Sequence, residues 1–176
     1  NHLTAQDLVG DDRLIGYSDY GSAVQALIAG DVDTVIIDDV AGILELLAPL
    51  EAEGVLVKRS RELLEMEIDK FTVLKKEEVI IACAALYPYA DAKMGEVACV
   101  AIHPDYRKGN RGGRLMDALE HEAKQQGISK IFVLTTVSGH WFLEKGFIEQ
   151  SMEKLPEGKQ KMYNFQRKSK VFIKSI

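Results

Sequence analysis

The sequence has very little cysteine: Cys83 and Cys99 are its two thiols, and both lie inside apolar stretches. Two residues so placed form neither the framework of a disulfide-rich secreted domain nor the spaced Cys and His set of a metal site. We therefore expect no metal ion, a reducing cytoplasmic setting, and two free cysteines that pack as small buried hydrophobic groups.

The sequence also lacks long apolar runs and an excess of positive charge. No run approaches the roughly 18 residues of a transmembrane helix, and no charged-then-apolar leader opens the chain, so we expect neither a membrane span nor a signal peptide. The formal net charge is -5, which argues against a surface that binds nucleic acid as a whole. Any site for an anion must therefore be local.

The pattern of apolar residues predicts both helices and strands. The first 31 residues are rich in Asp and Gly and carry no chemistry that we can name, so we expect an N-terminal segment over 1–31 and one domain over 32–176. Helices are expected at 38–54, 60–69, 112–126 and 138–146, and strands at 32–37, 70–75, 79–89, 96–102, 130–136, 147–152 and 169–174. This mixture, with its central series of strands, predicts an α/β or α+β fold.

Several residues predict where the helices begin or end. Pro49 should bend or end the first helix, and Gly54 should stop it. Ser60 and Ser138 are expected N-caps, and Gly146 should close the short helix that begins near Ser138.

The loop between the strand at 96–102 and the helix at 112–126 concentrates positive charge and glycine. It contains four cations and three glycines: Arg107, Lys108, Arg111 and Arg114, with Gly109, Gly112 and Gly113. A strand that enters a helix through glycines leaves backbone N–H groups without intrahelical partners, and these groups, together with the helix dipole, attract phosphates. The loop spells neither the Walker ending Gly-Lys-Ser/Thr nor G-x-G-x-x-G. It predicts a phosphate-binding loop of another kind, with a solvated basic turn as the alternative.

The segment VACVAIHPDYRKGNRGGRLMDAL resembles the acetyl-CoA segment of the GCN5-related N-acetyltransferases. The resemblance implies that family's fold, a mixed and mostly antiparallel central sheet flanked by helices, and a loop Arg/Gln-x-x-Gly-x-Gly/Ala that binds the diphosphate of the co-substrate. Arg107 takes the first position and Gly112 the last, while Asn110 replaces the middle glycine; Asn tolerates a positive φ better than most residues. The residues implied in acetyl-CoA binding are Cys99, Val100, Ala101, Ile102, Arg107, Lys108, Gly109, Asn110, Arg111, Gly112 and Gly113.

Further stretches, among them GVLVKRSRELLEMEIDKFTV, GEVACVAIHPDYR and YNFQRKSKV, resemble the acetyltransferase domain of bacterial N-acetylglutamate synthases over about residues 32–174. That resemblance implies transfer of acetyl from acetyl-CoA to the α-amine of L-glutamate, the first step of arginine biosynthesis, with these two small molecules as partners and neither nucleic acid nor a membrane. Members usually carry an upstream amino-acid-kinase-like domain that binds arginine, which residues 1–31 do not resemble. A homo-oligomer and a covalent fusion to an upstream domain both stay open.

Acetyl transfer to an amine needs a group that takes the amine proton, and a carboxylate can do so directly or through a water. Glu96 opens the strand at 96–102, at the position that the resemblance marks as the base; an exposed strand-end residue is the alternative. Backbone N–H groups between Val100 and Ile102, where the resemblance implies a bulge, could hold the thioester and stabilise the oxyanion. Phe142 stands where many relatives have a Tyr that protonates the departing thiolate. Water or another group, with Tyr163 a weak candidate, would replace that Tyr.

Glutamate brings two carboxylates, which the forked side chain of Arg suits well. The period of a strand would place Arg167 and Ser169 on one face of the strand expected near the C-terminus. The resemblance assigns both residues to glutamate binding, with Leu56 and Lys58. A solvated basic edge strand is the alternative.

In the family a basic residue follows the word LPE, and here it corresponds to Lys159 or Lys161. Two other functions stay open for the chain. One is the same transfer to a different amine, and the other is a non-catalytic module that binds acetyl-CoA or an amino acid to regulate an attached enzyme.

Overall fold

The computed structural model describes residues 39–76 and 79–176; the expected strand at 32–37 and the expected boundary after residue 31 lie outside the described residues. A 6-stranded sheet has the order β1-β2-β3-β4-β6-β5. Its strands are β1 (Phe71–Lys76), β2 (Val79–Tyr89), β3 (Met94–Ile102), β4 (Lys130–Thr135), β5 (Ile148–Gln150) and β6 (Lys170–Ser175). Neighbouring strands are antiparallel except β3 and β4, which are parallel. The predicted mixed, mostly antiparallel sheet is confirmed.

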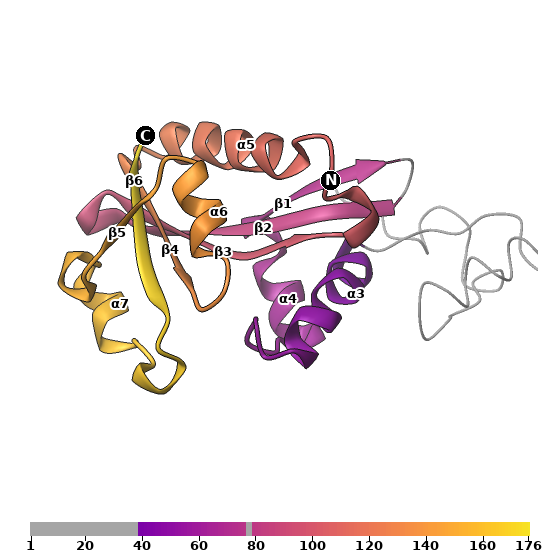
Figure 1. The fold of residues 1–176 in the computed structure, drawn as a ribbon, viewed down its shortest axis with the longest axis horizontal. Coiled ribbons are helices and arrows are strands. Elements are labelled where there is room, and N and C mark those ends of the chain that lie inside the picture. The colour runs from indigo at the N-terminus through magenta and orange to yellow at the C-terminus, as the bar shows by residue number, and fades with distance from the viewer. Residues whose placement is uncertain (1–38, 77–78) are drawn as a thin grey trace, which may run out of the picture.

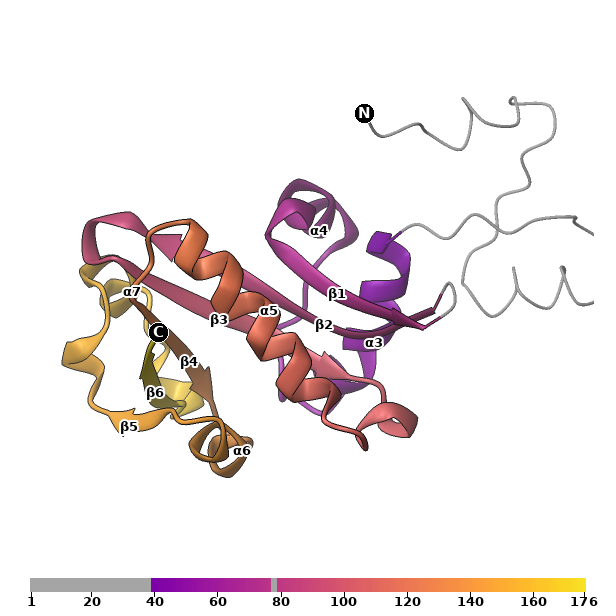
Figure 2. The ribbon, with the colours of Figure 1, turned by 90° about the horizontal axis from the view of Figure 1, so that it is seen from above.

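Helices cover both faces of this sheet. As Figure 1 shows, α5 (Arg111–Gln125) lies over one face, while α3 (Asp39–Ala52), α4 (Arg61–Glu67) and α7 (Glu157–Lys161) lie on the other. The short helix α6 (Gly139–Glu144) packs beside β6. Figure 2 shows α5 running obliquely over the strands. No helix in the described ranges is long and apolar enough to cross a membrane.

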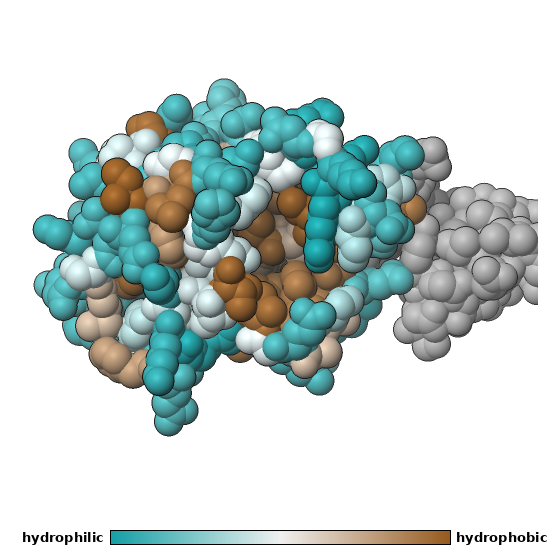
Figure 3. Space-filling view, in the orientation of Figure 1, coloured by the Kyte–Doolittle hydropathy of each residue, from teal (hydrophilic) through white to brown (hydrophobic). Residues whose placement is uncertain are grey.

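The face that carries α3 and α4 is hollowed near its middle. Figure 3, in the orientation of Figure 1, shows hydrophobic side chains in a recess between α6 and β4 on one side and α3 and α4 on the other. Hydrophilic side chains surround the recess. An apolar concavity with a polar rim is the usual form of a small-molecule site.

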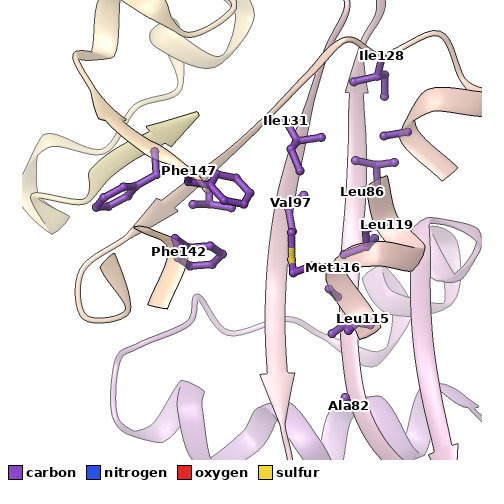
Figure 4. Packing of buried hydrophobic residues seen from close by; sticks show 14 residues of the cluster. Ala82, Leu86, Val97, Leu115, Met116, Leu119, Ile128, Ile131, Phe142 and Phe147 are labelled. Carbon is purple, nitrogen blue, oxygen red and sulfur yellow. The ribbon is translucent and has the colours of Figure 1, made fainter. Parts of the chain in front are cut away.

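The core on the α5 face is the larger packing layer. Leu115 and Leu119 of α5 are fully buried, because residues four apart lie on one side of a helix. They pack with Val97 of β3 in one cluster, which Figure 4 shows from close by. Phe142 and Phe147 extend this cluster toward β6, with ring centroids 5.4 Å apart at an interplanar angle of 71°. This layer fixes α5 and α6 relative to the sheet.

A second core lies under α3 and α4. Ile43, Leu47 and Leu64 pack there against the two cysteines, Cys83 and Cys99. Both thiols are free and buried, so the expectation that they act as small buried hydrophobic groups is confirmed.

The predicted ends of the first two helices are mostly confirmed. Gly54, with φ at 71°, follows α3 and donates its N–H to Glu51 O. Ser60 caps α4 by accepting the N–H of Leu63. Pro49, however, lies inside α3 and does not end it. It removes one backbone donor, and the bond from Glu53 N to Pro49 O still forms at 3.1 Å.

The helix α6 begins after Ser138 and ends before Gly146, as predicted, but its N-cap makes no side-chain hydrogen bond. Gly146 follows it with φ at 84°, which confirms the predicted stop. The predicted N-cap bond from Ser138 is wrong, because its side chain makes no capping hydrogen bond. Thr135 Oγ1 instead accepts the N–H groups of Val137 and Ser138, at 3.3 and 3.0 Å.

Candidate active site

The two parallel strands at the centre of the sheet separate soon after they meet. β3 and β4 pair from Met94 to Glu96, where Glu96 lies opposite Phe132. Beyond that point β3 stays bonded to β2 as far as Ile102, whereas β4 stays bonded to β6 as far as Thr135. Figure 1 shows the two strands diverging toward the recess seen in Figure 3. Glu96 therefore lies at the apex of the gap between the strands.

A β-bulge interrupts β3 within this gap. The register between β2 and β3 shifts so that Cys99 and Val100 together lie opposite Ala84. Cys99 has a φ of 53°, the left-handed conformation found at some bulges, which leaves one residue of the strand unpaired. The bulge was predicted near Val100–Ile102 and lies at the start of that range.

The bulge decides which side chains face which core. Ala98 and Cys99 both pack toward the α3 side, and Val97 and Val100 pack toward the α5 side. Regular alternation would have sent Ala98 and Cys99 to opposite faces. The extra residue is left out of the ladder with β2, and the Cys99 carbonyl accepts the Cys83 thiol at 3.6 Å.

Glu96 is buried, with 8% of its surface exposed. Lys159 Nζ lies 2.6 Å from Glu96 Oε1, and the Tyr89 hydroxyl donates to Glu96 Oε2 at 3.4 Å. Burial, then the charge and hydrogen bond of Glu96, raise the pKa of Tyr89 to about 12, so this phenol stays a donor at neutral pH. The alternative of an exposed strand-end glutamate is wrong.

A second polar cluster lies behind the bulge, on the α4 side. Arg59 Nε donates to Cys99 Sγ at 3.0 Å, and Arg59 Nη1 donates to Glu67 Oε2 at 2.9 Å. The Tyr87 hydroxyl donates to the same Glu67 oxygen at 2.7 Å. Sequence reasoning missed Arg59 and selected its neighbour Lys58, which is exposed.

The two cysteines are poor nucleophiles in this structure. Burial raises the pKa of the Cys99 thiol even though Arg59 acts in the opposite direction, and burial also raises the pKa of Cys83. The reactive form of cysteine is the thiolate. A covalent acetyl-cysteine on either residue is therefore disfavoured.

The basic loop reaches the N-terminus of α5 in a strained conformation. Asn110 immediately precedes α5 with φ at 54°, a conformation that Asn tolerates better than most residues, and Gly109 has φ at 82°. Its side chain makes no capping bond, and the first turn of α5 contains no acidic residue. The first N–H groups of α5 are thus left for an anion, and the exposed side chains of Arg107 and Lys108 lie just before them.

Arg111 folds back on this loop. Its Nη1 donates to the carbonyl oxygens of Lys108 and Tyr106, and its guanidinium lies 5.2 Å from the centre of the Tyr106 ring. These contacts fix the shape of the loop as well as placing a positive charge beside it.

The glycines at the start of α5 allow close packing. A Cβ added at Gly112 would lie 2.7 Å from Cζ2 of Trp141, and one at Gly113 would lie 2.2 Å from Asn110 Oδ1. The same Asn110 oxygen accepts the ammonium of Lys145 at 3.3 Å. Glycine at both positions lets the loop and α6 approach α5 directly.

Arg167 and Ser169 do not share a strand face, and that prediction is wrong. Arg167 ends a short 3-10 helix (Phe165–Arg167), and Lys168 has φ at 51°, so the chain turns before β6 begins. The turn directs Arg167 Nη2 to the carbonyl oxygens of Val55 and Gly54, at 2.8 and 3.3 Å.

The contact of Arg167 brings together two segments that the sequence separates widely. It places the C-terminal basic segment beside the loop that carries Leu56, half-buried, and Lys58, exposed. Ser169 lies next to Arg167 and accepts the Tyr163 hydroxyl through its carbonyl. Four of the residues predicted to bind one substrate therefore come from two neighbouring loops.

Phe142, which stands where many relatives have a Tyr that protonates the thiolate, is part of the core. Phe142 is 5% exposed and packs against Trp141 and Phe147. Tyr163, the weak substitute, already donates its hydroxyl proton to Ser169. Across residues 39–76 and 79–176, no three His, Cys, Asp or Glu side chains gather as metal ligands would.

Comparison with known proteins identifies the class of this chain. Residues 40–145 match the Acetyltransferase (GNAT) family, and the chain belongs to that family. It is 50% identical over 177 residues to the amino-acid acetyltransferase of Salmonella arizonae, a match that covers 93% of this chain and 40% of the relative. The chain thus spans about 40% of the length of this curated relative.

Two solved structures of one enzyme are also similar. The N-acetylglutamate synthase of Neisseria gonorrhoeae complexed with coenzyme A and N-acetyl-glutamate has a TM-score of 0.76 and 38% identity, over 80% of this chain and 33% of that one. Its complex with coenzyme A and L-arginine gives a TM-score of 0.70 at 38% identity, over 78% of this chain and 31% of that one.

The packing of Asn110 against Gly113 generates a double-mutant test. Gly113→Ala should displace the Asn110 side chain, because the new Cβ would lie 2.2 Å from Asn110 Oδ1 and 2.7 Å from its Cγ, and this displacement should offset the stabilising effect of Ala in the helix. In an Asn110→Gly background those atoms are absent, and Ala favours a helix by about 1 kcal/mol over Gly, so the same substitution should be neutral or stabilising. Chemical denaturation of the four proteins should give a coupling of about 1 kcal/mol or more. Additive effects would contradict this packing.

Proposed function

We propose that this chain is the acetyltransferase part of an N-acetylglutamate synthase and moves acetyl from acetyl-CoA to the α-amine of L-glutamate. The observation that carries the proposal is the buried Glu96 carboxylate at the apex of the gap between β3 and β4. The 50% identity to an amino-acid acetyltransferase supports it, as does the likeness to a synthase complexed with coenzyme A and N-acetyl-glutamate.

The loop and the gap suit acetyl-CoA. The uncapped N-terminus of α5 offers N–H groups for the diphosphate, and Arg107, Lys108 and Arg111 provide positive charge with Gly109, Asn110, Gly112 and Gly113 between or beside them. The edge of β3 from Cys99 through Val100 and Ala101 to Ile102 would align the pantetheine arm and the thioester. The unpaired backbone at the bulge is suited to stabilise the oxyanion.

In the transfer, the amine nitrogen bonds to the acetyl carbon and the C–S bond breaks. Glu96 accepts the proton that the amine loses, directly or through a water. The thiolate takes a proton from water, since Phe142 has none to give and the Tyr163 hydroxyl is hydrogen-bonded to the backbone carbonyl of Ser169. The products are N-acetyl-L-glutamate and coenzyme A.

The glutamate carboxylates are assigned to the two neighbouring loops. Arg167 and Ser169 would contact one carboxylate, with Leu56 and Lys58 beside it. Both described contacts of Arg167 use Nη2, so donors on Nε and Nη1 are left for a carboxylate. A fork of this kind recognises a planar anion better than a point charge does.

The wider setting follows from the same relatives. We propose a cytoplasmic enzyme with its acetyltransferase domain over 32–176, an N-terminal segment over 1–31, and acetyl-CoA and L-glutamate as partners. The synthase of Neisseria gonorrhoeae was also solved with L-arginine, and the relatives are longer than this chain, which supports fusion to a further domain.

The substrate is tested by measuring CoA release with a panel of amino acids. L-Glutamate should give the highest kcat/KM, and L-glutamine should fall by roughly tenfold to a hundredfold, because one charged partner of the site is lost at about 1.5–3 kcal/mol. Faster release with another amine would establish the different-amine alternative. Acetyl-CoA binding with no release for any amine would establish a non-catalytic module.

The base is tested with Glu96→Gln. Loss of a general base should lower turnover by about a hundredfold or more while sparing acetyl-CoA binding, and the loss should shrink at high pH, where the amine deprotonates without help. Glu157→Gln, an exposed glutamate of α7, is the matched control and should leave turnover unchanged. A near-normal rate for Glu96→Gln at neutral pH would remove Glu96 from the mechanism.

Arg167 is tested by separating charge from geometry. Arg167→Ala should raise the KM for glutamate by roughly tenfold to a hundredfold, the effect of losing a charged hydrogen bond of about 1.5–3 kcal/mol. Arg167→Lys keeps the charge without the fork and should recover part of that loss. The KM for acetyl-CoA should hardly change in either Arg167 variant. Lys154→Ala, which alters an exposed lysine, is the control and should change neither KM. If the KM values for glutamate and acetyl-CoA rise together, the role of Arg167 is to hold the loop at Val55 and not to bind glutamate.

A further inference from the structure

Glu96 combines charge with burial, and its partner Lys159 is half-buried. The side chain of Glu96 is 11% exposed and that of Lys159 is 18% exposed, with Nζ 2.6 Å from Oε1. In the described part of the chain, Glu96 is the one charged residue that is buried. Opposite charges in such a place interact more strongly than at the surface, because less solvent screens them. The ion pair therefore acts directly on the group proposed as the base.

The fold aims Lys159 at this carboxylate. Lys159 lies on α7, in the connection from β5 to β6, and its N–H bonds to Pro156 O at 2.9 Å. A Cβ added at the preceding Gly158 would lie 3.7 Å from Cε1 of Tyr89, so α7 packs against the tyrosine that also faces Glu96. Lys161, on the same short helix, is exposed. The inward lysine and the outward lysine of α7 thus form a natural test pair.

The other ionisable groups near Glu96 come from three directions. From β2, Tyr89 donates to Oε2, and Tyr87, which the register sets opposite Glu96, donates its hydroxyl to Glu67 instead. On β3 itself, burial raises the pKa of the Cys99 thiol, opposed by Arg59, and the charge of Glu96 adds to the increase. Arg59 approaches from the loop before α4 but is bonded to Cys99 and Glu67.

The residue opposite Glu96 on β4 is the apolar Phe132. Lys159 is therefore the cation in contact with Glu96 among the residues that the structure describes. Among those residues no second ammonium or guanidinium contacts Glu96, so removal of Lys159 leaves the carboxylate without a paired cation.

We propose that Lys159 is a positioning residue for Glu96, whose ammonium keeps the carboxylate ionised and oriented before the amine arrives. The inference rests on the proposed function of Glu96 as the base. A buried carboxyl without a cation favours its neutral form, and the neutral form cannot accept the amine proton. The same ammonium offsets the attraction of the Glu96 carboxylate for a protonated amine, so a substrate amine there is protonated less readily than it would be beside Glu96 without Lys159.

The kinetic test compares Lys159→Met with Lys159→Arg. Met removes the charge at similar length, so the acid limb of the pH profile of kcat/KM should move to higher pH by roughly 1–3 units, the usual effect of one adjacent charge. Arg keeps a cation and should restore most of the limb. Lys161→Met removes the outward lysine and should leave the profile unchanged. A merely structural lysine would alter the rate at all pH values alike and would not shift the limb.

A titration without substrate tests the same inference independently of activity. The protein is labelled with glutamate carrying ¹³C at the side-chain carboxyl, and the Glu96 resonance is the one lost in Glu96→Gln. Its titration midpoint should rise in Lys159→Met and return toward the unaltered protein in Lys159→Arg. If Lys159→Met does not fold, Lys159→Gln is measured in its place.

The outcomes separate this inference from the proposed function. An unchanged midpoint in a folded Lys159→Met or Lys159→Gln protein would overturn the role of Lys159, whatever the turnover. Near-normal turnover in Glu96→Gln would instead remove the proposed base, while the titration would still decide whether Lys159 controls the ionisation of Glu96.

Discussion

β3 and β4 pair from Met94 to Glu96 and then separate, while each strand remains bonded to its other neighbour. One wall of the gap therefore belongs to the antiparallel ladder of β3 with β2, and the other to that of β4 with β6. A bulge such as that at Cys99 increases the local twist and leaves one residue of β3 out of the ladder with β2. The candidate site depends on this separation, since it places Glu96 at the apex, the bulge along one wall, and the basic loop at the open end of β3.

The cations near the candidate site of this acidic chain each make a different local contact. Arg111 bonds to carbonyls of its own loop, and Arg59 lies in the buried cluster with Cys99 and Glu67. Arg167 ties the C-terminal segment to the loop after α3, and Lys159 pairs with Glu96. Each cation thus shapes the site locally, which agrees with a net charge of -5 that gives no general affinity for anions.

Much of the fold was predictable from local patterns. The strand at 79–89 has the bounds that the sequence predicts, and Asn110 adopts a positive φ, which Asn tolerates better than most residues. The contact of Tyr89 with Glu96 could have been found, because the antiparallel register sets Tyr87 opposite Glu96 and residues two apart on a strand share a face.

Other features depended on interactions that no local pattern contains. The pair of Lys159 and Glu96 joins residues far apart in the chain, and one of them lies on a helix too short to show a period. The shared strand face predicted for Arg167 and Ser169 failed because Lys168 adopts a left-handed turn, and Ser138 stands at the N-cap of α6 without a side-chain hydrogen bond. A crystal structure with coenzyme A and N-acetyl-L-glutamate would test the central claim most directly. The account predicts the diphosphate at the N-terminus of α5, the pantetheine arm between β3 and β4, and the acetamide nitrogen within about 3.2 Å or one bridging water of Glu96. Coenzyme A bound outside the gap, or an acetamide remote from Glu96, would contradict it.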